Sequence, residues 1–441
     1  MHCRPSQGVE IAELSRQMSA QETRPVRIAF LMDNLSGGGA ERVILNLASG
    51  FASAGYVVDL LVCKMKGELK DRVPPNVNLV QLRATSSLRG VVAAFFVDPG
   101  CVPPVLAMLA STGKLPGTFK SLTAIIKYLK ARQPQALLSA LPKSNINAVL
   151  AGRRRSGATR IAVGVHVNYS AQSRMAKKEN EMVDNYWLTM IRRYYHQADV
   201  VIAVSRGAEK DVSEYLGLPR ERVTSVYNPI ATRDIRVLCE AVPDHPWFGG
   251  DGAPVILGMG RFAAEKNFPL LLDAFAKVRQ QRDVRLVLLG GNVTSDKQRC
   301  LRQALIVQAE RLGVEPDFDM PGFVDNPFAY LNRAAVFVLS SDHEGFGNVL
   351  VEALLCGCQV VSTDCPSGPA EILDNGKYGE LVPVGDACKL ADAICRTLDA
   401  PKDKDFLRSR GGEFSIEKAV DNYRRILLED GPAMARSNTS R

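Results

Sequence analysis

The chain has 441 residues, which is long enough for two or three ordinary domains. Apolar residues make up 46% of it and charged residues 23%, a balance that excludes a disordered or fibrous protein. The net charge of +8 is uneven, because residues 1–245 carry 32 Lys and Arg against 20 Asp and Glu, whereas residues 246–441 carry 23 against 27. The basic first half indicates either an anionic ligand or surface on that side or a solvated basic face.

Residues 1–24 form a polar extension that lacks the apolar core of a secretory signal, which favours a cytoplasmic location. An apolar stretch at 91–110, VVAAFFVDPGCVPPVLAMLA, approaches the length of a membrane span. Its centre is interrupted by Asp98 and by prolines and a glycine, which would be costly in a spanning helix. We therefore expect an apolar insert near 91–118 made of two short segments, which either pack inside the protein or contact a membrane interface.

Short apolar runs alternate with longer amphipathic stretches along the chain, a pattern typical of parallel sheets covered by helices on both faces. In the first half, strands are predicted at 27–32, 57–63, 136–139, 161–165 and 200–204. A segment rich in Pro and Gly at 229–253 indicates a linker.

After the linker the same pattern restarts. Strands are predicted at 255–259, 284–289, 335–339 and 359–362, and helices at 268–281, 296–312, 347–356 and 415–428. We therefore expect an α/β fold with two Rossmann-like, doubly wound domains, the first at 25–228 and the second at 254–430, followed by a tail at 431–441.

Three glycines follow the first predicted strand in the segment SGGGAERV, just before a helical pattern. Glycines at this position let backbone N–H groups converge on an anion at a helix N-terminus, where the helix macrodipole favours negative charge. Gly38 and Gly39 are therefore candidates for phosphate binding. The alternative is a tight turn that only packs.

The segment GMGRFA at 258–263 matches the glycine pattern of dinucleotide-binding folds. The next predicted strand, however, ends without the acidic residue that would hold the ribose of a nicotinamide cofactor. Gly260 is instead followed by Arg261 and Lys266, two cations at the carboxyl end of a strand. They suit a diphosphate leaving group, and a surface salt bridge is the alternative.

Two glutamates, Glu344 and Glu352, flank a loop that leads from a strand into a helix in the segment EGFGNVLVE. Between them, the amides of Gly347, Asn348 and Val349 are available to phosphate oxygens at the helix start. Because carboxylates accept hydrogen bonds from vicinal hydroxyls, the spacing fits a sugar and a ribose on either side of a diphosphate. That ligand is a nucleotide sugar, although Glu352 could also be an ordinary surface acid.

In this order and spacing the motifs resemble the retaining GT-B-fold glycosyltransferases of family 4. The resemblance covers nearly the whole chain and includes GGGAERV, GMGRFAAEKNFPLLLDAF, GFVDNP and EGFGNVLVEALLCG. It implies two Rossmann-like domains facing a cleft, with the nucleotide sugar held mainly by the C-terminal domain and the acceptor by the N-terminal one. It also implies retention at the anomeric carbon with neither metal nor cofactor, and no DxD motif stands beside a predicted strand.

The resemblance assigns roles to individual residues. It places Arg261 and Lys266 on the donor diphosphate, Glu344 on hydroxyls of the transferred sugar and Glu352 on the nucleotide ribose. It places His166 beside the transferred sugar, although a lone His at a strand end is also often structural. The donor-binding set that it implies is completed by Gly38, Gly39, Gly260, Phe323, Gly347, Asn348 and Val349.

The expected function is transfer of a sugar from UDP-hexose or UDP-N-acetylhexosamine to a lipid-linked diphosphate sugar or a polysaccharide in bacterial surface-glycan synthesis. The basic first half and the apolar insert favour peripheral contact with the anionic inner face of the plasma membrane. A nucleotide-sugar epimerase of the same fold and a non-catalytic sugar-binding protein remain alternatives. Nucleic acid is not expected as a partner, because the Arg triplet at 153–155 has no interleaved aromatic residues.

Overall fold

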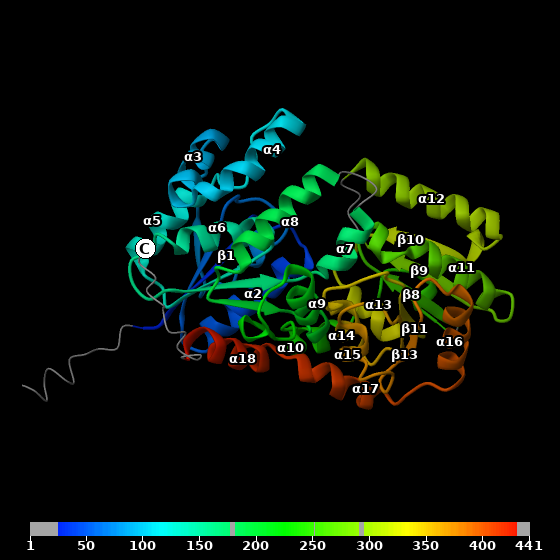
Figure 1. The fold of residues 1–441 in the computed structure, drawn as a ribbon. Coiled ribbons are helices and arrows are strands. Elements are labelled where there is room, and N and C mark those ends of the chain that lie inside the picture. The colour runs from blue at the N-terminus through cyan, green and yellow to red at the C-terminus, as the bar shows by residue number, and fades with distance from the viewer. Residues whose placement is uncertain (1–24, 177–180, 251, 291–294, 430–441) are drawn as a thin grey trace, which may run out of the picture.

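The computed structural model describes residues 25–176, 181–250, 252–290 and 295–429; the predicted N-terminal extension and C-terminal tail lie outside these ranges. The described chain forms two domains side by side, each built on one parallel sheet with helices packed around it (Figure 1). This architecture confirms the predicted pair of doubly wound α/β domains.

The first domain has a seven-stranded parallel sheet in the order β3-β2-β1-β4-β5-β6-β7. Its strands are β1 (Arg27–Met32), β2 (Val57–Val62), β3 (Asn78–Gln81), β4 (Ala136–Ala140), β5 (Arg160–Val165), β6 (Val200–Ala203) and β7 (Val223–Ser225). Its helices are α2 (Gly39–Ser53), α3 (Ser87–Val97), α4 (Val102–Thr112), α5 (Leu122–Arg132), α6 (Pro142–Gly152), α7 (Tyr169–Ala176), α8 (Glu181–Tyr195) and α9 (Arg206–Leu216).

The second domain has a six-stranded parallel sheet in the order β10-β9-β8-β11-β12-β13. Its strands are β8 (Val255–Met259), β9 (Arg285–Leu289), β10 (Phe318–Gly322), β11 (Val336–Leu339), β12 (Val360–Thr363) and β13 (Glu380–Val382). The remaining helices are α10 (Thr232–Leu238), α11 (Phe268–Arg279), α12 (Asp296–Leu312), α13 (Pro327–Arg333), α14 (Asn348–Leu355), α15 (Pro369–Ile372), α16 (Ala387–Asp399), α17 (Lys404–Gly411) and α18 (Ile416–Leu428).

All nine predicted strands are present, and the four strands that the pattern missed are the outermost strands of the two sheets: β3, β7, β10 and β13. Each is three to five residues long and partly exposed. A central parallel strand is buried on both faces and therefore reads as a continuous apolar run, whereas an edge strand is not. The missing signal thus follows from the position of these strands in the sheet.

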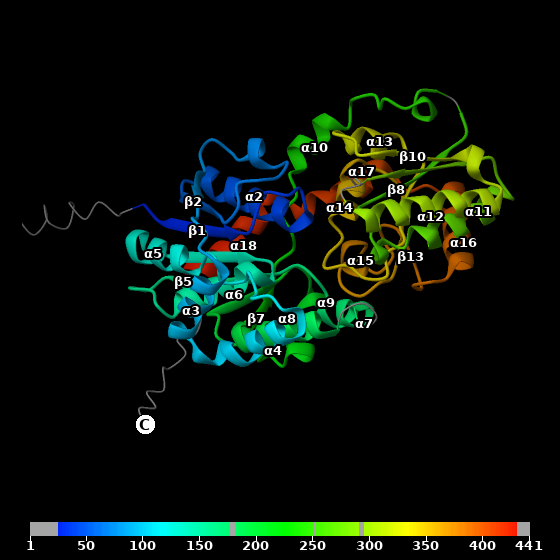
Figure 2. The same cartoon turned by 90° about the horizontal axis from the view of Figure 1, so that it is seen from above.

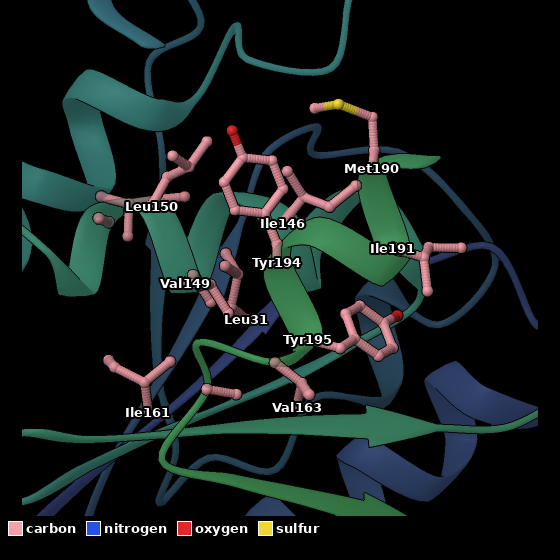
Figure 3. Packing of buried hydrophobic residues seen from close by; sticks show 14 of the residues in the cluster. Leu31, Ile146, Val149, Leu150, Ile161, Val163, Met190, Ile191, Tyr194 and Tyr195 are labelled. Carbon is pink, nitrogen blue, oxygen red and sulfur yellow. The ribbon is translucent and has the colours of Figure 1, made fainter. Parts of the chain in front are cut away.

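Alternate residues of β1 show how each sheet is buried on both faces. Ala29 and Leu31 point into one apolar cluster, together with residues of α5, α6 and α8, while Ile28, Phe30 and Met32 point into a second cluster with α2. Figure 3 shows the first cluster, in which the rings of Tyr194 and Tyr195 from α8 and the side chain of Ile146 from α6 lie over the sheet. A period of two along a strand produces this division.

The last helix crosses back to the first domain. The predicted division groups 415–428 with the second domain, but in the structure α18 packs against α2 of the first (Figure 2). Its side chains Val420, Tyr423 and Leu427 are buried in the same cluster as β1. Gly50 of α2 allows this approach, because a Cβ there would lie 2.5 Å from Ile416 Cγ2.

The chain passes between the domains twice, and the two crossings run side by side. One follows β7, and the other lies between α17 and α18. The Ile230 N–H donates to the Phe414 carbonyl at 2.9 Å, and Ile230 pairs with Ser415 as an isolated parallel bridge. The crossings are therefore joined to each other by hydrogen bonding.

The predicted apolar insert consists of two short helices, α3 and α4, separated at Asp98. Asp98 is buried and accepts hydrogen bonds from Arg193 Nε and Nη2, both at 2.9 Å, and from Tyr194 Oη at 3.0 Å. The Arg193 guanidinium lowers the pKa of Asp98 to about 2. Among the helices that the structure describes, none is long and apolar enough to cross a membrane.

Replacing Tyr423 with Ala should destabilise the protein by about 3–5 kcal/mol, the usual loss for truncating a buried aromatic ring, because α18 would lose its contact with the first domain. Urea unfolding followed by circular dichroism measures the change. The matched control is Asp421→Ala on the exposed face of α18, which should stay within about 0.5 kcal/mol of wild type. Equal stability of the two variants would contradict this role of α18.

Candidate active site

The candidate site lies where the strand order of the second sheet reverses. From β8 the chain adds β9 and β10 on one side of the sheet, and then returns to add β11, β12 and β13 on the other side of β8. Ligands of open α/β sheets bind at such a point, beyond the carboxyl ends of the strands. Lys266 follows β8, and Glu344 follows β11. The fold therefore brings together two residues that are 78 positions apart in the sequence.

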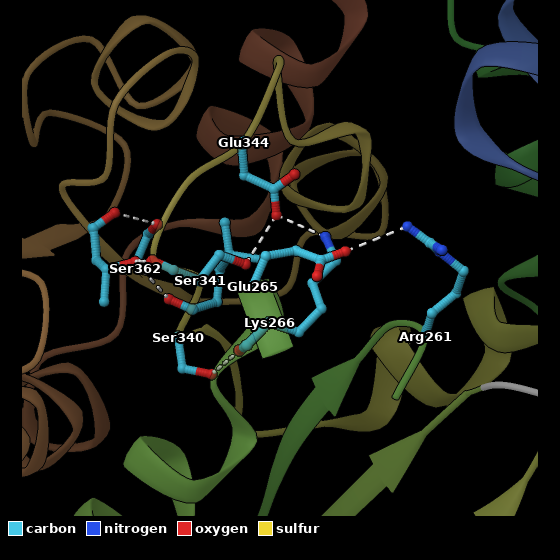
Figure 4. A network of polar contacts seen from close by, with 9 residues as sticks. Arg261, Glu265, Lys266, Ser340, Ser341, Glu344 and Ser362 are labelled. Carbon is cyan, nitrogen blue, oxygen red and sulfur yellow. Dashed lines mark hydrogen bonds and ion pairs between the residues drawn. The ribbon is translucent and has the colours of Figure 1, made fainter. Parts of the chain in front are cut away.

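Lys266 and Glu344 form a direct ion pair (Figure 4). Lys266 Nζ lies 2.6 Å from Glu344 Oε1, and the same oxygen accepts a hydrogen bond from Ser341 Oγ at 2.8 Å. The two side chains are only 16% and 12% exposed. A charge-assisted hydrogen bond with this little water around it holds both groups in fixed positions.

Further polar contacts attach the turn that carries Lys266 to the loop that carries Glu344. Ser340 Oγ donates to the Lys266 carbonyl at 2.8 Å, and the Asp342 N–H donates to the Glu265 carbonyl at 2.9 Å. Asn267 Nδ2 donates to Asp342 Oδ1 at 2.8 Å. The ion pair therefore rests on a rigid support rather than on two free loops.

Arg261 lies apart from this pair, at the rim. Its side chain is 67% exposed and pairs with Glu265 at 3.3 Å. Its charge also reaches Glu41 at the start of α2, where burial raises the pKa of the Glu41 carboxyl and Arg261 partly opposes that rise. Arg261 is thus a cation facing the first domain, free to turn toward an anion between the domains.

Two helix N-termini from different domains face each other beside the pair. Gly38 precedes the first turn of α2, and Gly347 precedes that of α14 with a φ of 97°, a left-handed conformation that favours glycine. A Cβ on Gly39 would lie 3.8 Å from Asn348 Nδ2, so the two helix starts are in contact distance. The positive dipole end of each helix favours an anion nearby, and at the α2 start the Glu41 carboxylate already lies against Gly38 and bonds its own backbone N–H.

Glu352 lies in the second turn of α14 and is 8% exposed. Burial raises the pKa of its carboxyl, and the charge of Arg42 opposes the rise. Arg42 Nη1, on α2 of the other domain, lies 3.9 Å from Glu352 Oε1. Among the described residues, this long contact with Arg42 is the ion pair of the Glu352 carboxylate, and it joins the second domain to the first.

His166 follows β5 and borders the site from the first domain. Its backbone touches the loop beside Glu344, because a Cβ on Gly345 would lie 2.1 Å from the His166 carbonyl oxygen. Ser205 Oγ donates to the Gly345 carbonyl at 2.7 Å and fixes the same loop. Burial lowers the pKa of His166 to about 4, so its imidazole is neutral near pH 7.

The other predicted residues lie at different distances from the pair. The Lys266 stem passes over Gly260, where a Cβ would lie 3.4 Å from Lys266 Cε, and Val349 packs in the first turn of α14. Phe323 lies beyond the end of the edge strand β10, two strands from β8, with 47% of its surface exposed. Its role in donor binding stays a prediction.

Sequence reasoning missed the partners that come from other parts of the chain. Arg42, Glu41 and Ser341 are ordinary helix or loop residues in the sequence, and only the facing of the two domains gives Arg42 its contact with Glu352. Asn228 also donates through Nδ2 to Asn348 Oδ1 at 2.8 Å, from one domain crossing to the start of α14. The only signal for Arg42 and Glu41 was their place directly after the glycine loop.

Comparison with known proteins agrees with this two-domain fold. The family model described as Glycosyltransferase Family 4 matches residues 37–234, and the one described as Glycosyl transferases group 1 matches residues 253–400. The solved structure of HepE from Anabaena in complex with UDP aligns with 91% of this chain and 99% of its own, at a TM-score of 0.67 and 18% identity. Sucrose-phosphate synthase from Thermosynechococcus elongatus aligns with 92% and 100% of the two chains, at a TM-score of 0.70 and 19% identity.

Two curated relatives are similar in sequence. One is N-acetylgalactosamine-N,N'-diacetylbacillosaminyl-diphospho-undecaprenol 4-alpha-N-acetylgalactosaminyltransferase of Campylobacter jejuni, 28% identical over 58% of this chain and 66% of that protein. The other is the lipopolysaccharide core biosynthesis glycosyltransferase LpsE of Rhizobium meliloti, 32% identical over 53% and 65%. The match thus spans slightly less than two thirds of each relative.

With both halves of the chain matched and the two-domain fold shared, this protein belongs to the family 4, group 1 glycosyltransferases of GT-B fold.

Proposed function

We propose that this protein is a retaining glycosyltransferase that moves a hexose or N-acetylhexosamine from a UDP-sugar to a lipid-linked or polysaccharide acceptor in bacterial surface-glycan synthesis. The observation that carries the proposal is the Lys266–Glu344 pair at the switch point of the second sheet, beside the facing starts of α2 and α14. Cations and helix amides meet the diphosphate, and carboxylates meet the hydroxyls on either side of it.

In the proposed donor complex the diphosphate lies beside the two helix starts, within reach of Lys266 and Arg261. Glu352 accepts hydrogen bonds from the ribose hydroxyls, since Arg42, at 3.9 Å, is its one ion-pair partner among the residues that the structure describes. Glu344 exchanges part of its contact with Lys266 for hydroxyls of the transferred sugar. The ion pair thereby gives one group to each half of the donor.

For the reaction we propose same-face attack assisted by the leaving group. The bond between the anomeric carbon and the diphosphate oxygen breaks, the acceptor hydroxyl oxygen bonds to that carbon from the same face, and its proton passes to the departing phosphate. Lys266, Arg261 and the helix amides stabilise the negative charge that grows on that phosphate, without a metal in this proposal. Neutral His166 contributes a hydrogen bond beside the sugar rather than a charge.

The relatives support the class of donor and acceptor. The HepE structure contains UDP, and the Campylobacter jejuni relative is named for transfer of N-acetylgalactosamine to a diphospho-undecaprenol acceptor. LpsE is named for lipopolysaccharide core biosynthesis. A UDP-sugar donor and a lipid-linked acceptor are the proposals that agree with all of these names.

The insert offers a surface for peripheral membrane contact. Leu88, Val92, Phe95 and Phe96 recur at helical spacing on one face of α3, and all four are exposed, Phe96 by 68%. Leu106 of α4 is exposed as well, and Arg154 donates to the Phe96 carbonyl near the C-terminal end of α3. Exposed apolar residues beside cations fit an anionic membrane interface, on the inner face of the plasma membrane in this proposal.

UDP should raise the melting temperature of the purified protein in a thermal-shift panel of UDP, GDP, ADP, UDP-sugars and NAD, because a ligand that binds only the folded state stabilises it by mass action. At 100 times its Kd the gain is about 2.7 kcal/mol. NAD is the control and should give no shift. A shift with NAD alone would overturn the proposal.

Lys266→Ala should lower kcat by about 10²–10³-fold, because stabilisation of the leaving diphosphate is lost. Glu352→Gln should raise the Kd for UDP about tenfold, because a charged hydrogen-bond acceptor for the ribose hydroxyls is lost. Transfer kinetics and calorimetric UDP titration measure the two effects. Lys389→Ala and Glu315→Gln, at exposed positions of the same domain, are the controls. Wild-type behaviour of both site variants would show that the site is assigned wrongly.

The protein should sediment with anionic phosphatidylglycerol liposomes more than with neutral phosphatidylcholine ones, and Phe96→Ser combined with Leu106→Ser should abolish most of the difference. The control is Val307→Ser, which removes an exposed apolar residue from α12 in the other domain. Equal sedimentation of the wild-type protein with both kinds of liposome would refute membrane contact.

A further inference from the structure

The first sheet carries an ion pair at the same topological place as the Lys266–Glu344 pair of the second. Its strand order reverses between the neighbouring strands β1 and β4. Asp33 follows β1, and Lys143 lies in the first turn of α6 after β4. Lys143 Nζ is 2.7 Å from Asp33 Oδ1, so the pair spans the second place in this molecule where an open sheet provides a ligand crevice.

A second lysine joins the pair from the next strand. Lys64 follows β2, and its Nζ lies 3.4 Å from Asp33 Oδ2. Burial opposes ionisation of Asp33, but Lys143 and Lys64 together hold the pKa of its carboxyl below the ordinary value. Two lysines and one carboxylate together carry one net positive charge. Lys64 has 53% of its side chain exposed and can therefore contact a ligand.

The segment that carries Lys64 is fixed against the glycine loop. The Leu35 N–H donates to the Lys66 carbonyl at 2.9 Å, and the Leu69 N–H donates back to the Leu35 carbonyl at 2.9 Å. A Cβ on Gly67 would lie 2.1 Å from the Leu35 carbonyl oxygen, so only glycine permits this packing. The backbone that carries Lys64 is thus fixed, and its ion pair with Asp33 holds the ammonium group before any ligand arrives, which lowers the entropic cost of binding one.

This cluster lies close to the candidate donor site. The Glu41 carboxylate is near enough to both Asp33 and Arg261 that the charges of both shift its pKa, in opposite directions. Asp33 and Glu41 stand on either side of the glycine loop, whose last residue Gly39 approaches Asn348. The glycine loop thus connects the cluster to the start of α2 beside the candidate donor site.

We propose that Lys64 and Lys143, held in place by Asp33, form a subsite for the phosphate of the acceptor. The inference rests on the proposed function and deepens it, because it selects a phosphorylated or diphosphorylated acceptor over a neutral polysaccharide. Each ammonium group has donors beyond the one directed at Asp33, and phosphate oxygens accept them as a second anion beside the carboxylate. The acceptor hydroxyl then lies between this subsite and the donor diphosphate.

The test is binding of diphosphates while UDP saturates the donor site. The probes are farnesyl diphosphate, farnesol and inorganic pyrophosphate, each titrated by calorimetry at a detergent concentration that keeps the lipids dispersed. The variants are Lys64→Ala, at a position whose side chain is 53% exposed, and Lys143→Ala with Lys143→Arg as its rescue. The matched control is Lys130→Ala. This exposed lysine lies near the C-terminal end of α5, which leads into the amino end of β4, whereas the cluster lies beyond the carboxyl ends of the strands.

Wild-type protein should bind farnesyl diphosphate and not farnesol, and each alanine variant should bind it at least about tenfold more weakly, with Lys143→Arg recovering part of the loss. The UDP thermal shift should stay unchanged in all variants. Tighter binding of farnesyl diphosphate than of pyrophosphate identifies a lipid-linked acceptor, and equal binding identifies a soluble phosphorylated one.

The inference is overturned if both alanine variants bind diphosphate like wild type, or if wild type binds farnesol as well as farnesyl diphosphate. In either case a normal UDP shift leaves the proposed function standing. Absence of any UDP shift in wild type would instead refute the proposed function itself, so the two failures are distinguishable.

Discussion

The structure depends on holding two independently wound sheets with their carboxyl edges directed toward the same space. Each sheet alone offers only half of the site, since the second domain supplies Lys266, Glu344 and Glu352 while the first supplies Arg42, His166 and the glycine loop. The return of α18 to the first domain meets this requirement by burying apolar side chains against α2. Burial of that kind is the dominant favourable term in folding, so the contact anchors α18 firmly to the first domain.

Electrostatics complete what packing begins. If only cations lined the site, their like charges would repel one another. If only carboxylates lined it, their repulsion would favour protonation of some of them. Each switch point instead holds lysine against carboxylate, Lys266 with Glu344 and Lys143 with Asp33, so the charges are ordered before a ligand arrives. Loss of one partner from such a pair is costlier than loss of both, because a poorly solvated charge is left behind. Pairing therefore keeps these lysines and carboxylates charged and in place, with a smaller loss of stability than unpaired charges would cause.

Much of this arrangement was predictable from sequence, because central parallel strands are continuous apolar runs and glycine loops follow them. The positions of Lys266 and Glu344 beyond β8 and β11 follow from that pattern. Contacts across the cleft were not predictable, since Arg42 meets Glu352 only after the domains face each other. The docking of α18 was equally hidden, because the periodicity of its apolar residues does not say which domain they pack against, and the contact with α2 is seen in the structure alone. Edge strands such as β13 were missed because they are partly exposed to solvent, and exposed positions need not carry apolar residues.

The two crossings between the domains have a mechanical consequence. A single flexible linker lets two bodies twist and slide in any direction, but here the segments near Ile230 and Ser415 run in parallel and are bonded to each other. Two joined strands resist shear and twist while still bending together. The domain movement that this double connection opposes least is therefore a rotation about an axis through the pair, and such a rotation would change the distance between Arg42 and Glu352 on the two sides of the site.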